Sequence, residues 1–176
     1  MKMSDTRDIQ ADPATVYAAL LDPETLKACV PGAQEVVGNV TDGYEATVVQ
    51  KVGPVKATFK GQVRMSDLVE GEKLVITGEG KGGAAGFAKG GAEVRFEAIE
   101  GGTRLSYDVD AKVGGKLAQL GSRIIDGFAK RMADQFFANL QTAIEGPSED
   151  TSQDGDANKA AASEKKGWLG RLTGRE

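Results

Sequence analysis

Residues 104–121 read Arg104-Leu105-Ser106-Tyr107-Asp108-Val109-Asp110-Ala111-Lys112-Val113-Gly114-Gly115-Lys116-Leu117-Ala118-Gln119-Leu120-Gly121. Up to Val113 apolar and polar residues alternate, which is typical of an antiparallel strand with one buried and one solvated face. Beyond the glycines the apolar spacing becomes helical, and one helix is predicted over residues 116–145, roughly 45 Å long at 1.5 Å per residue. This order predicts an α+β protein in which a curved antiparallel sheet is closed by a single helix and encloses an apolar cavity.

The same alternation marks strands upstream. It is clearest over residues 55–65 and 93–99, where charged residues fill one face. Further strands are predicted over residues 2–9, 34–41, 43–52 and 72–80. Hairpin turns are predicted at three glycine-containing pairs: Gly53-Pro54, Glu70-Gly71 and Gly101-Gly102.

Two short helices are predicted after the first strand, over residues 13–21 and 23–28. Each begins at an aspartate followed by proline, Asp12-Pro13 and Asp22-Pro23. An aspartate side chain caps a helix N-terminus, and proline fits the first helical position. Pro31-Gly32 should end this helical region.

Composition excludes several classes of function. The 176-residue chain contains no histidine, so it has no Ser–His–Asp or Cys–His arrangement and no histidine-ligated metal. The net charge of −4 argues against a nucleic-acid partner. The single Cys29 excludes an intramolecular disulfide and is interpreted as a small buried hydrophobe in a cytoplasmic protein. No secretory signal and no membrane-spanning run is present, so the protein is expected to be cytoplasmic or peripheral on a membrane.

The predicted cavity follows from the small residues on the inner face of the sheet, such as Ala57, Gly61 and Ala111, and from an aromatic content of only 6%. We expect an apolar pocket of roughly 300 Å³ or more between sheet and helix. Its predicted lining is Phe59, Val63, Phe96, Tyr107, Leu120, Ile124 and Phe128. In the predicted helix, Gly121 and Gly127 indicate either close backbone packing or room for a ligand.

Gly78-Glu79-Gly80-Lys81-Gly82-Gly83 formally matches a dinucleotide-binding fingerprint. That motif requires a following helix within a βαβ unit, whereas here the sequence continues into another alternating strand. The glycines are therefore interpreted as a bend or bulge at a strand end. Acidic pairs such as Asp108 and Asp110 fall on the outer face and are interpreted as a solvated surface.

The C-terminal region divides into two segments. Residues 146–164 carry five acids and one lysine without any aliphatic side chain larger than alanine, so this acidic linker is predicted to be disordered. Residues 165–176 form a basic amphipathic tip that contains the only tryptophan of the chain. The tip is interpreted as a tether to a membrane surface or a protein partner, the alternative being a terminus without a function. Its predicted contact residues are Lys165, Lys166, Trp168, Leu169, Arg171, Leu172 and Arg175.

Four segments carry a family resemblance: Asp22-Pro23-Glu24-Thr25-Leu26, Cys29-Val30-Pro31-Gly32-Ala33, Val52-Gly53-Pro54-Val55 and Gly114–Gly121. Together, over residues 1–145, they resemble the G-subunit family of carbon monoxide dehydrogenase, which belongs to the START-like, helix-grip superfamily. The resemblance implies a seven-stranded antiparallel sheet gripping the C-terminal helix.

The resemblance also implies an accessory role beside molybdenum hydroxylases of the CO dehydrogenase type, which use a molybdopterin cofactor, FAD and iron–sulfur clusters. Members of the family are associated with recruiting that enzyme to the membrane and with handling its quinone acceptor. No residue of this chain is expected to hold those cofactors. The leading hypothesis is thus a non-enzymatic carrier of a lipid or quinone that docks a redox enzyme at the inner face of the cytoplasmic membrane. Two alternatives stay open: a cavity enzyme of the polyketide cyclase or aromatase type, and an assembly factor for the partner oxidase.

Overall fold

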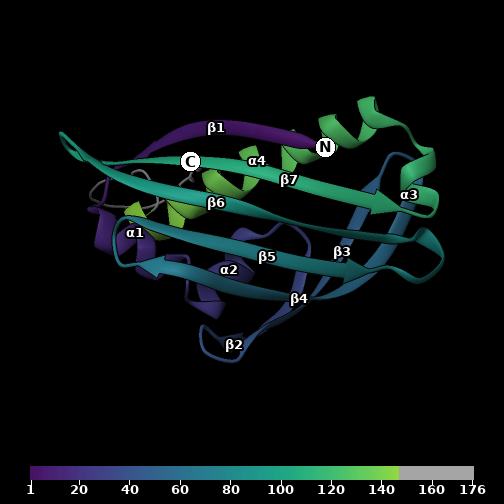
Figure 1. Cartoon of the computed structure of the whole chain (residues 1–176), viewed down its shortest axis with the longest axis horizontal. Helices are drawn as coiled ribbons and strands as arrows, with labels where there is room; N and C mark the ends of the chain where they lie inside the picture. The colour runs from purple at the N-terminus through teal and green to yellow at the C-terminus, as the bar shows by residue number, and fades with distance from the viewer. Residues whose placement is uncertain (147–176) are drawn as a thin grey trace, which may run out of the picture. The chain divides into compact units, whose positions relative to one another are not determined.

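The computed structural model describes residues 1–146, in which seven strands form one antiparallel sheet (Figure 1). The sheet has the order β1-β7-β6-β5-β4-β3-β2, so β1 and β2 lie at its two edges. The strands are β1 (Lys2–Ile9), β2 (Ala33–Asn39), β3 (Gly43–Val52), β4 (Val55–Val69), β5 (Lys73–Lys81), β6 (Phe87–Ile99) and β7 (Gly102–Gly114). All seven predicted strands are present, and β4 and β6 are longer than predicted.

The two short helices are α1 (Pro13–Ala19) and α2 (Pro23–Cys29). Each has the predicted cap, because the Asp12 and Asp22 side chains accept hydrogen bonds from the backbone nitrogens of Thr15 and Thr25. A 3₁₀ turn, η1 (Gly83–Ala85), connects β5 to β6. This turn replaces the helix that a dinucleotide fingerprint would require.

The C-terminal helix differs from the prediction, because it is broken near its start. Its two parts are α3 (Lys116–Gln119) and α4 (Ser122–Glu145). Gly121 separates them with φ +91°, a conformation that glycine adopts without the steric cost of a Cβ atom. Close packing does not explain Gly121, since a Cβ atom there would meet nothing within 4 Å, and Gly121 does not line the apolar cavity described below.

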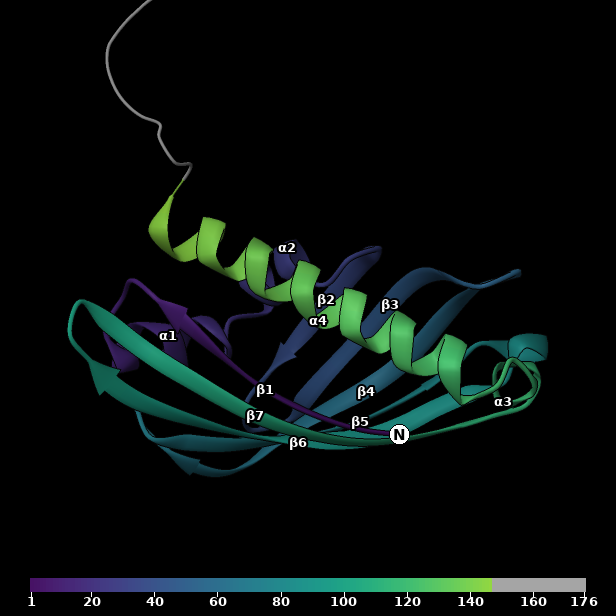
Figure 2. The same cartoon turned by 90° about the horizontal axis from the view of Figure 1, so that it is seen from above.

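Helix α4 lies across the concave face of the sheet (Figure 2). In the same view α1 is near one end of the strands and α3 near the other. No helix within residues 1–146 is long and apolar enough to cross a bilayer.

The larger hydrophobic core fills the end of the sheet near α1 and α2. Its aromatic residues pack in pairs: Tyr17 and Phe96 meet edge to face at 5.8 Å between ring centroids, and Tyr107 stacks on Phe137 at 5.1 Å. Leu140 of α4 is fully buried there. This end is closely filled by large side chains.

Candidate functional site

An apolar cavity of about 430 Å³ lies between the inner face of the sheet and α3 and α4. Its volume falls within the range of small-molecule pockets, and it meets the size expected from the sequence. The lining residues come from the strands, the α2–β2 loop and the helices. They are Met1, Met3, Val30, Pro31, Val48, Gln50, Val52, Phe59, Ala88, Val109, Ala111, Val113, Leu117, Ile125, Phe128, Ala129, Met132, Ala133 and Phe136.

Small residues on facing elements leave this space open. On the helix side the wall includes Ala129 and Ala133, and on the sheet side Ala88 and Ala111. Across the strands from Ala111, Gly90 of β6 pairs with Gly78 of β5, so two more positions there have no side chain. These small residues leave open space beside a smaller core, in which Val52, Leu117 and Ile125 are buried.

Glycines also shape the wall near η1. A Cβ atom on Gly82 would lie 2.5 Å from Cε1 of Phe59, so only glycine allows the Phe59 ring its place in the lining. Gly86 has φ +109° and approaches the backbone of Gly114 and Gly115 so closely that a side chain would not fit. The glycines of the formal nucleotide motif and of the β7–α3 junction thus pack this end of the cavity.

Two of the seven predicted lining residues, Phe59 and Phe128, border the cavity. Phe96 and Tyr107 face inward as predicted but are buried in the larger core, and Val63 packs against that core. Alternation identifies their face correctly, whereas their position along the strands places them at the filled end.

Leu120 and Ile124 are also not in the cavity wall. Ile125 rather than Ile124 lines the cavity, because the cavity-facing stripe of α4 runs through Ile125, Ala129 and Met132, and Ile124 lies at its edge. Ile124 is 38% exposed and lies with Leu120 against the β3–β4 turn at Gly53. Gly127 does not line the cavity, and a Cβ atom there would have only Arg131 Nη1 nearby, at 3.5 Å.

Gln50 is a lining residue that the sequence analysis missed. It is the only polar side chain in the cavity wall within residues 1–146. Its amide nitrogen donates a hydrogen bond to the Pro31 carbonyl oxygen in the α2–β2 loop. The sequence does contain a signal for Gln50. In the strand 43–52, Tyr44, Val48 and Val52 mark the even-numbered positions as the inner face, and Gln50 is one of these positions.

Charged side chains of the described residues lie outside the cavity wall, in which the Met1 ammonium donates a hydrogen bond to the Ala111 carbonyl oxygen. Arg7 of β1 donates a hydrogen bond to Asp134 of α4, and its guanidinium lies 5.2 Å from the centroid of the Phe137 ring. The hydrogen bond from Arg7, with a second from Lys130, holds the pKa of Asp134 below its ordinary value. The hydroxyl of Tyr107 is buried without a hydrogen-bond partner among the described residues. This cluster joins β1 to α4 beside the filled core.

Cys29 and Asp108 lie where the sequence predicts, Cys29 in the interior and Asp108 on the outer face of the sheet. Cys29 is fully buried, and burial raises the pKa of its thiol. Asp108 lies exposed on the outer face, where it accepts hydrogen bonds from Ser4 and Arg95 that lower its pKa. No cluster of metal-ligating side chains occurs in residues 1–146.

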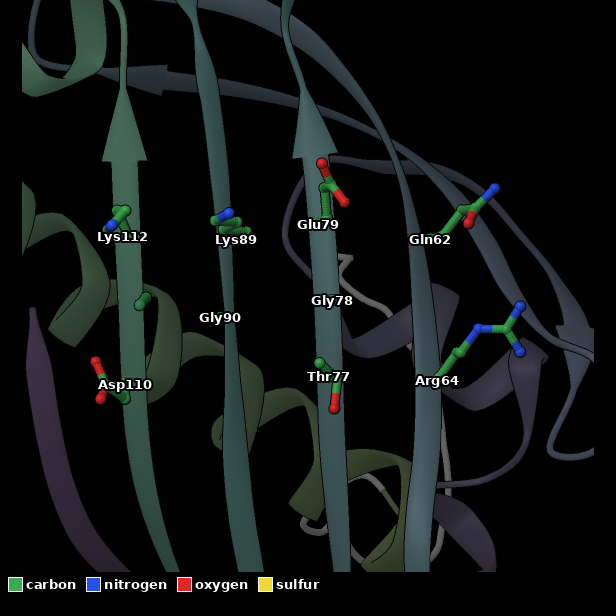
Figure 3. A pocket seen from close by; sticks show the side chains of 10 residues that line it. Gln62, Arg64, Thr77, Gly78, Glu79, Lys89, Gly90, Asp110 and Lys112 are labelled. Carbon is green, nitrogen blue, oxygen red and sulfur yellow. The ribbon is translucent and has the colours of Figure 1, made fainter.

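A second hollow, of about 460 Å³, lies on the outer face of β4, β5, β6 and β7 (Figure 3). Figure 3 shows Gln62, Glu79, Lys89 and Lys112 in a row across the four strands. These residues are exposed and hydrophilic. We assign the ligand site to the apolar cavity, because it is the one able to remove a hydrophobic molecule from water.

Comparison with known proteins gives the class and then the family. The seven-stranded sheet gripping a C-terminal helix is a START-like, helix-grip fold. A START superfamily protein from Mycobacterium smegmatis has a TM-score of 0.61 at 14% identity, covering 82% of this chain and 97% of that one. A protein from Thermus thermophilus has a TM-score of 0.64 at 16% identity, covering 85% and 100%. A conserved protein from Geobacillus kaustophilus reaches a TM-score of 0.77 at 25% identity, covering 82% and 95%.

The family model for the G subunit of carbon monoxide dehydrogenase (CoxG) matches residues 6–145. The chain therefore belongs to the CoxG family. No curated protein sequence matches it.

The acidic linker beyond residue 146 and the tip residues Lys165, Lys166, Trp168, Leu169, Arg171, Leu172 and Arg175 lie outside the described residues.

Proposed function

We propose that this protein is a non-enzymatic accessory protein that binds a neutral hydrophobic molecule, a quinone, in the cavity beneath α4. The partner would be a molybdenum hydroxylase of the CO dehydrogenase type, which the protein recruits to the inner face of the cytoplasmic membrane. The family's description as a part of carbon monoxide dehydrogenase supports this class of partner.

One observation carries the ligand-binding part of the proposal: the side chains that line the cavity of about 430 Å³ are all apolar except Gln50. Contact with such a wall removes apolar ligand surface from water, which contributes roughly 25 cal/mol per Å². An enzyme acting inside the cavity would need a positioned acid or base. No lining residue within the described part of the chain has a titratable side chain, which favours carriage over catalysis.

Extraction and a cavity-filling variant test the ligand. Protein purified from its host is extracted with organic solvent, and the extract is analysed by mass spectrometry for lipids and quinones. Delipidated protein is then titrated with a short-chain quinone. Ala129→Phe should fill the cavity and weaken binding at least about tenfold, since the ring occupies the ligand's space. Ala138→Phe is the matched control, because Ala138 is exposed on the same helix. Equal binding by both variants would place the ligand elsewhere.

Membrane recruitment is tested with a truncation at residue 164. The basic tip, residues 165–176, would bind an anionic leaflet weakly, with about 1 kcal/mol from each Lys or Arg opposed by the entropy of ordering the segment. Several tails on one oxidase assembly would add their affinities. We expect the full chain to float with phosphatidylglycerol vesicles at low salt and to be released at high salt. The truncated chain should not float but should still bind the quinone. Flotation of the truncated chain would rule out the tip as the anchor.

A further inference from the structure

Gln50 is a polar residue at a position where the sheet otherwise presents apolar side chains. It stands on the inner face of β3, between Val48 and Val52, and all three line the cavity. Burying an amide without hydrogen-bond partners costs free energy, so polar groups in such places are normally paired. Gln50 is half-buried, so its hydrogen-bonding groups need partners once a ligand displaces water from the cavity.

The α2–β2 loop fixes the orientation of the Gln50 carboxamide. Nε2 donates a hydrogen bond to the Pro31 carbonyl oxygen. A carbonyl oxygen only accepts, so this contact establishes which end of the amide is nitrogen. A carboxamide has a second N–H and an oxygen acceptor, and within residues 1–146 neither is taken by the protein.

These free groups face open space. The side-chain atoms that are fully buried and unpartnered in the described chain are Arg7 Nε and Tyr107 OH, so Oε1 of Gln50 is accessible. Since Gln50 borders the cavity, its free donor and acceptor are available to a molecule inside. A single polar side chain in a hydrocarbon wall provides one point at which a polar group of the ligand can be recognised.

We propose that Gln50 is the specificity-determining residue of the cavity, and that it hydrogen-bonds the hydroxyl or carbonyl group of an otherwise hydrocarbon ligand. The inference rests on the proposed carrier function and adds to it the residue that recognises the polar group of the ligand. No side chain in the wall offers a counter-charge to a carboxylate or an amine. The one charged group of a lining residue, the Met1 ammonium, already donates a hydrogen bond to the Ala111 carbonyl oxygen at 2.9 Å. A pure hydrocarbon would leave the free groups of Gln50 unpaired.

Three probes that share one ring system test the proposal: naphthalene, 2-naphthol and 2-naphthoate. Their affinities for the delipidated full-length protein are measured by calorimetry at neutral pH. We expect 2-naphthol to bind about tenfold more tightly than naphthalene, the usual effect of one hydrogen bond. The anionic 2-naphthoate should bind most weakly.

The variant Gln50→Leu separates recognition from a structural role. It should remove or reverse the preference for 2-naphthol while keeping or improving naphthalene binding. If Gln50 served only to hold the Pro31 loop, the variant would weaken both probes equally and keep their ratio. Gln62→Leu is the matched control, because Gln62 is exposed on the outer face of β4.

Two contrary results are distinguishable. An unchanged ratio in Gln50→Leu, or equal binding of naphthalene and 2-naphthol by the unmodified protein, overturns the role of Gln50 and leaves the carrier function standing. Failure of the unmodified protein to bind any of the three probes or the quinone overturns the carrier function as well.

Discussion

The two ends of the sheet follow the same alternating pattern and yet differ in what they enclose. Near α1 and α2 the inner positions carry aromatic and large aliphatic side chains, such as Phe96 and Leu105, which share one core with Phe137 and Leu140 of α4. Near α3 the facing positions include Ala88, Ala111, Ala129 and Ala133, and a cavity remains. Side-chain volume at inward positions thus divides this fold into a core that stabilises it and a space that can hold a ligand.

The largest expected effect is on the free energy of unfolding, when one large side chain is truncated at each end of the sheet. Leu140→Ala should lower the free energy of unfolding by about 2–5 kcal/mol, because Leu140 is fully buried and its removal leaves a void. Met132→Ala should cost only about 1 kcal/mol, since Met132 already borders open space. Urea denaturation of the ligand-free proteins measures both values. Equal losses would mean that the cavity end is as closely packed in solution as the filled end.

A more moderate change is expected where a glycine shapes the cavity wall. Gly82→Ala should destabilise the fold by about 1–3 kcal/mol and weaken ligand binding, because its Cβ atom would displace the Phe59 ring. Gly127→Ala is the control: it lies in α4 away from the cavity wall and should stabilise by up to about 1 kcal/mol. Urea denaturation and quinone titration follow both variants. Unchanged quinone affinity in Gly82→Ala would show that Phe59 is not part of the binding wall.

The smallest expected effect concerns the filled end, where one carboxylate, Asp134, makes stability depend on pH. The pKa of Asp134 is lowered from 3.8, first by the hydrogen bond from Arg7. Its contribution is therefore fully present above the unfolded-state pKa and is lost as the pH falls from about 4 through the folded-state value. Asp134→Asn should reduce the loss of stability in this acid range, measured by urea denaturation at several pH values. Asp126→Asn, exposed on the same helix and without an ion pair in the described chain, should leave the profile unchanged. Matching profiles for the two variants would show that the Arg7 contact carries no stability.

The helix break shows where pattern reasoning reaches its limit. The spacing of Phe128, Met132 and Phe136 predicts one face of the helix, and all three line the cavity. A step of four residues back from Phe128 selects Ile124, whereas Ile125, three residues before Phe128, is the one that lines the cavity. The pattern also presumes one helix across Gly121, where the structure has a break. A glycine in a helical pattern is compatible with either a tolerated interior position or a positive φ, and only the backbone conformation distinguishes the two.

Local sequence was sufficient to specify the strands, the two aspartate caps, the inward face of each strand and the expectation of an apolar space. These features depend on local periodicity and on the hydrogen-bonding chemistry of single residues, which a linear pattern contains. The three-dimensional packing set where α4 crosses the sheet, and hence that Phe96 and Tyr107 fill a core while Phe59 and Gln50 border a cavity. The physical reason is that alternation assigns a residue to a face of the sheet, whereas a cavity depends on which side chains from distant parts of the chain meet across it.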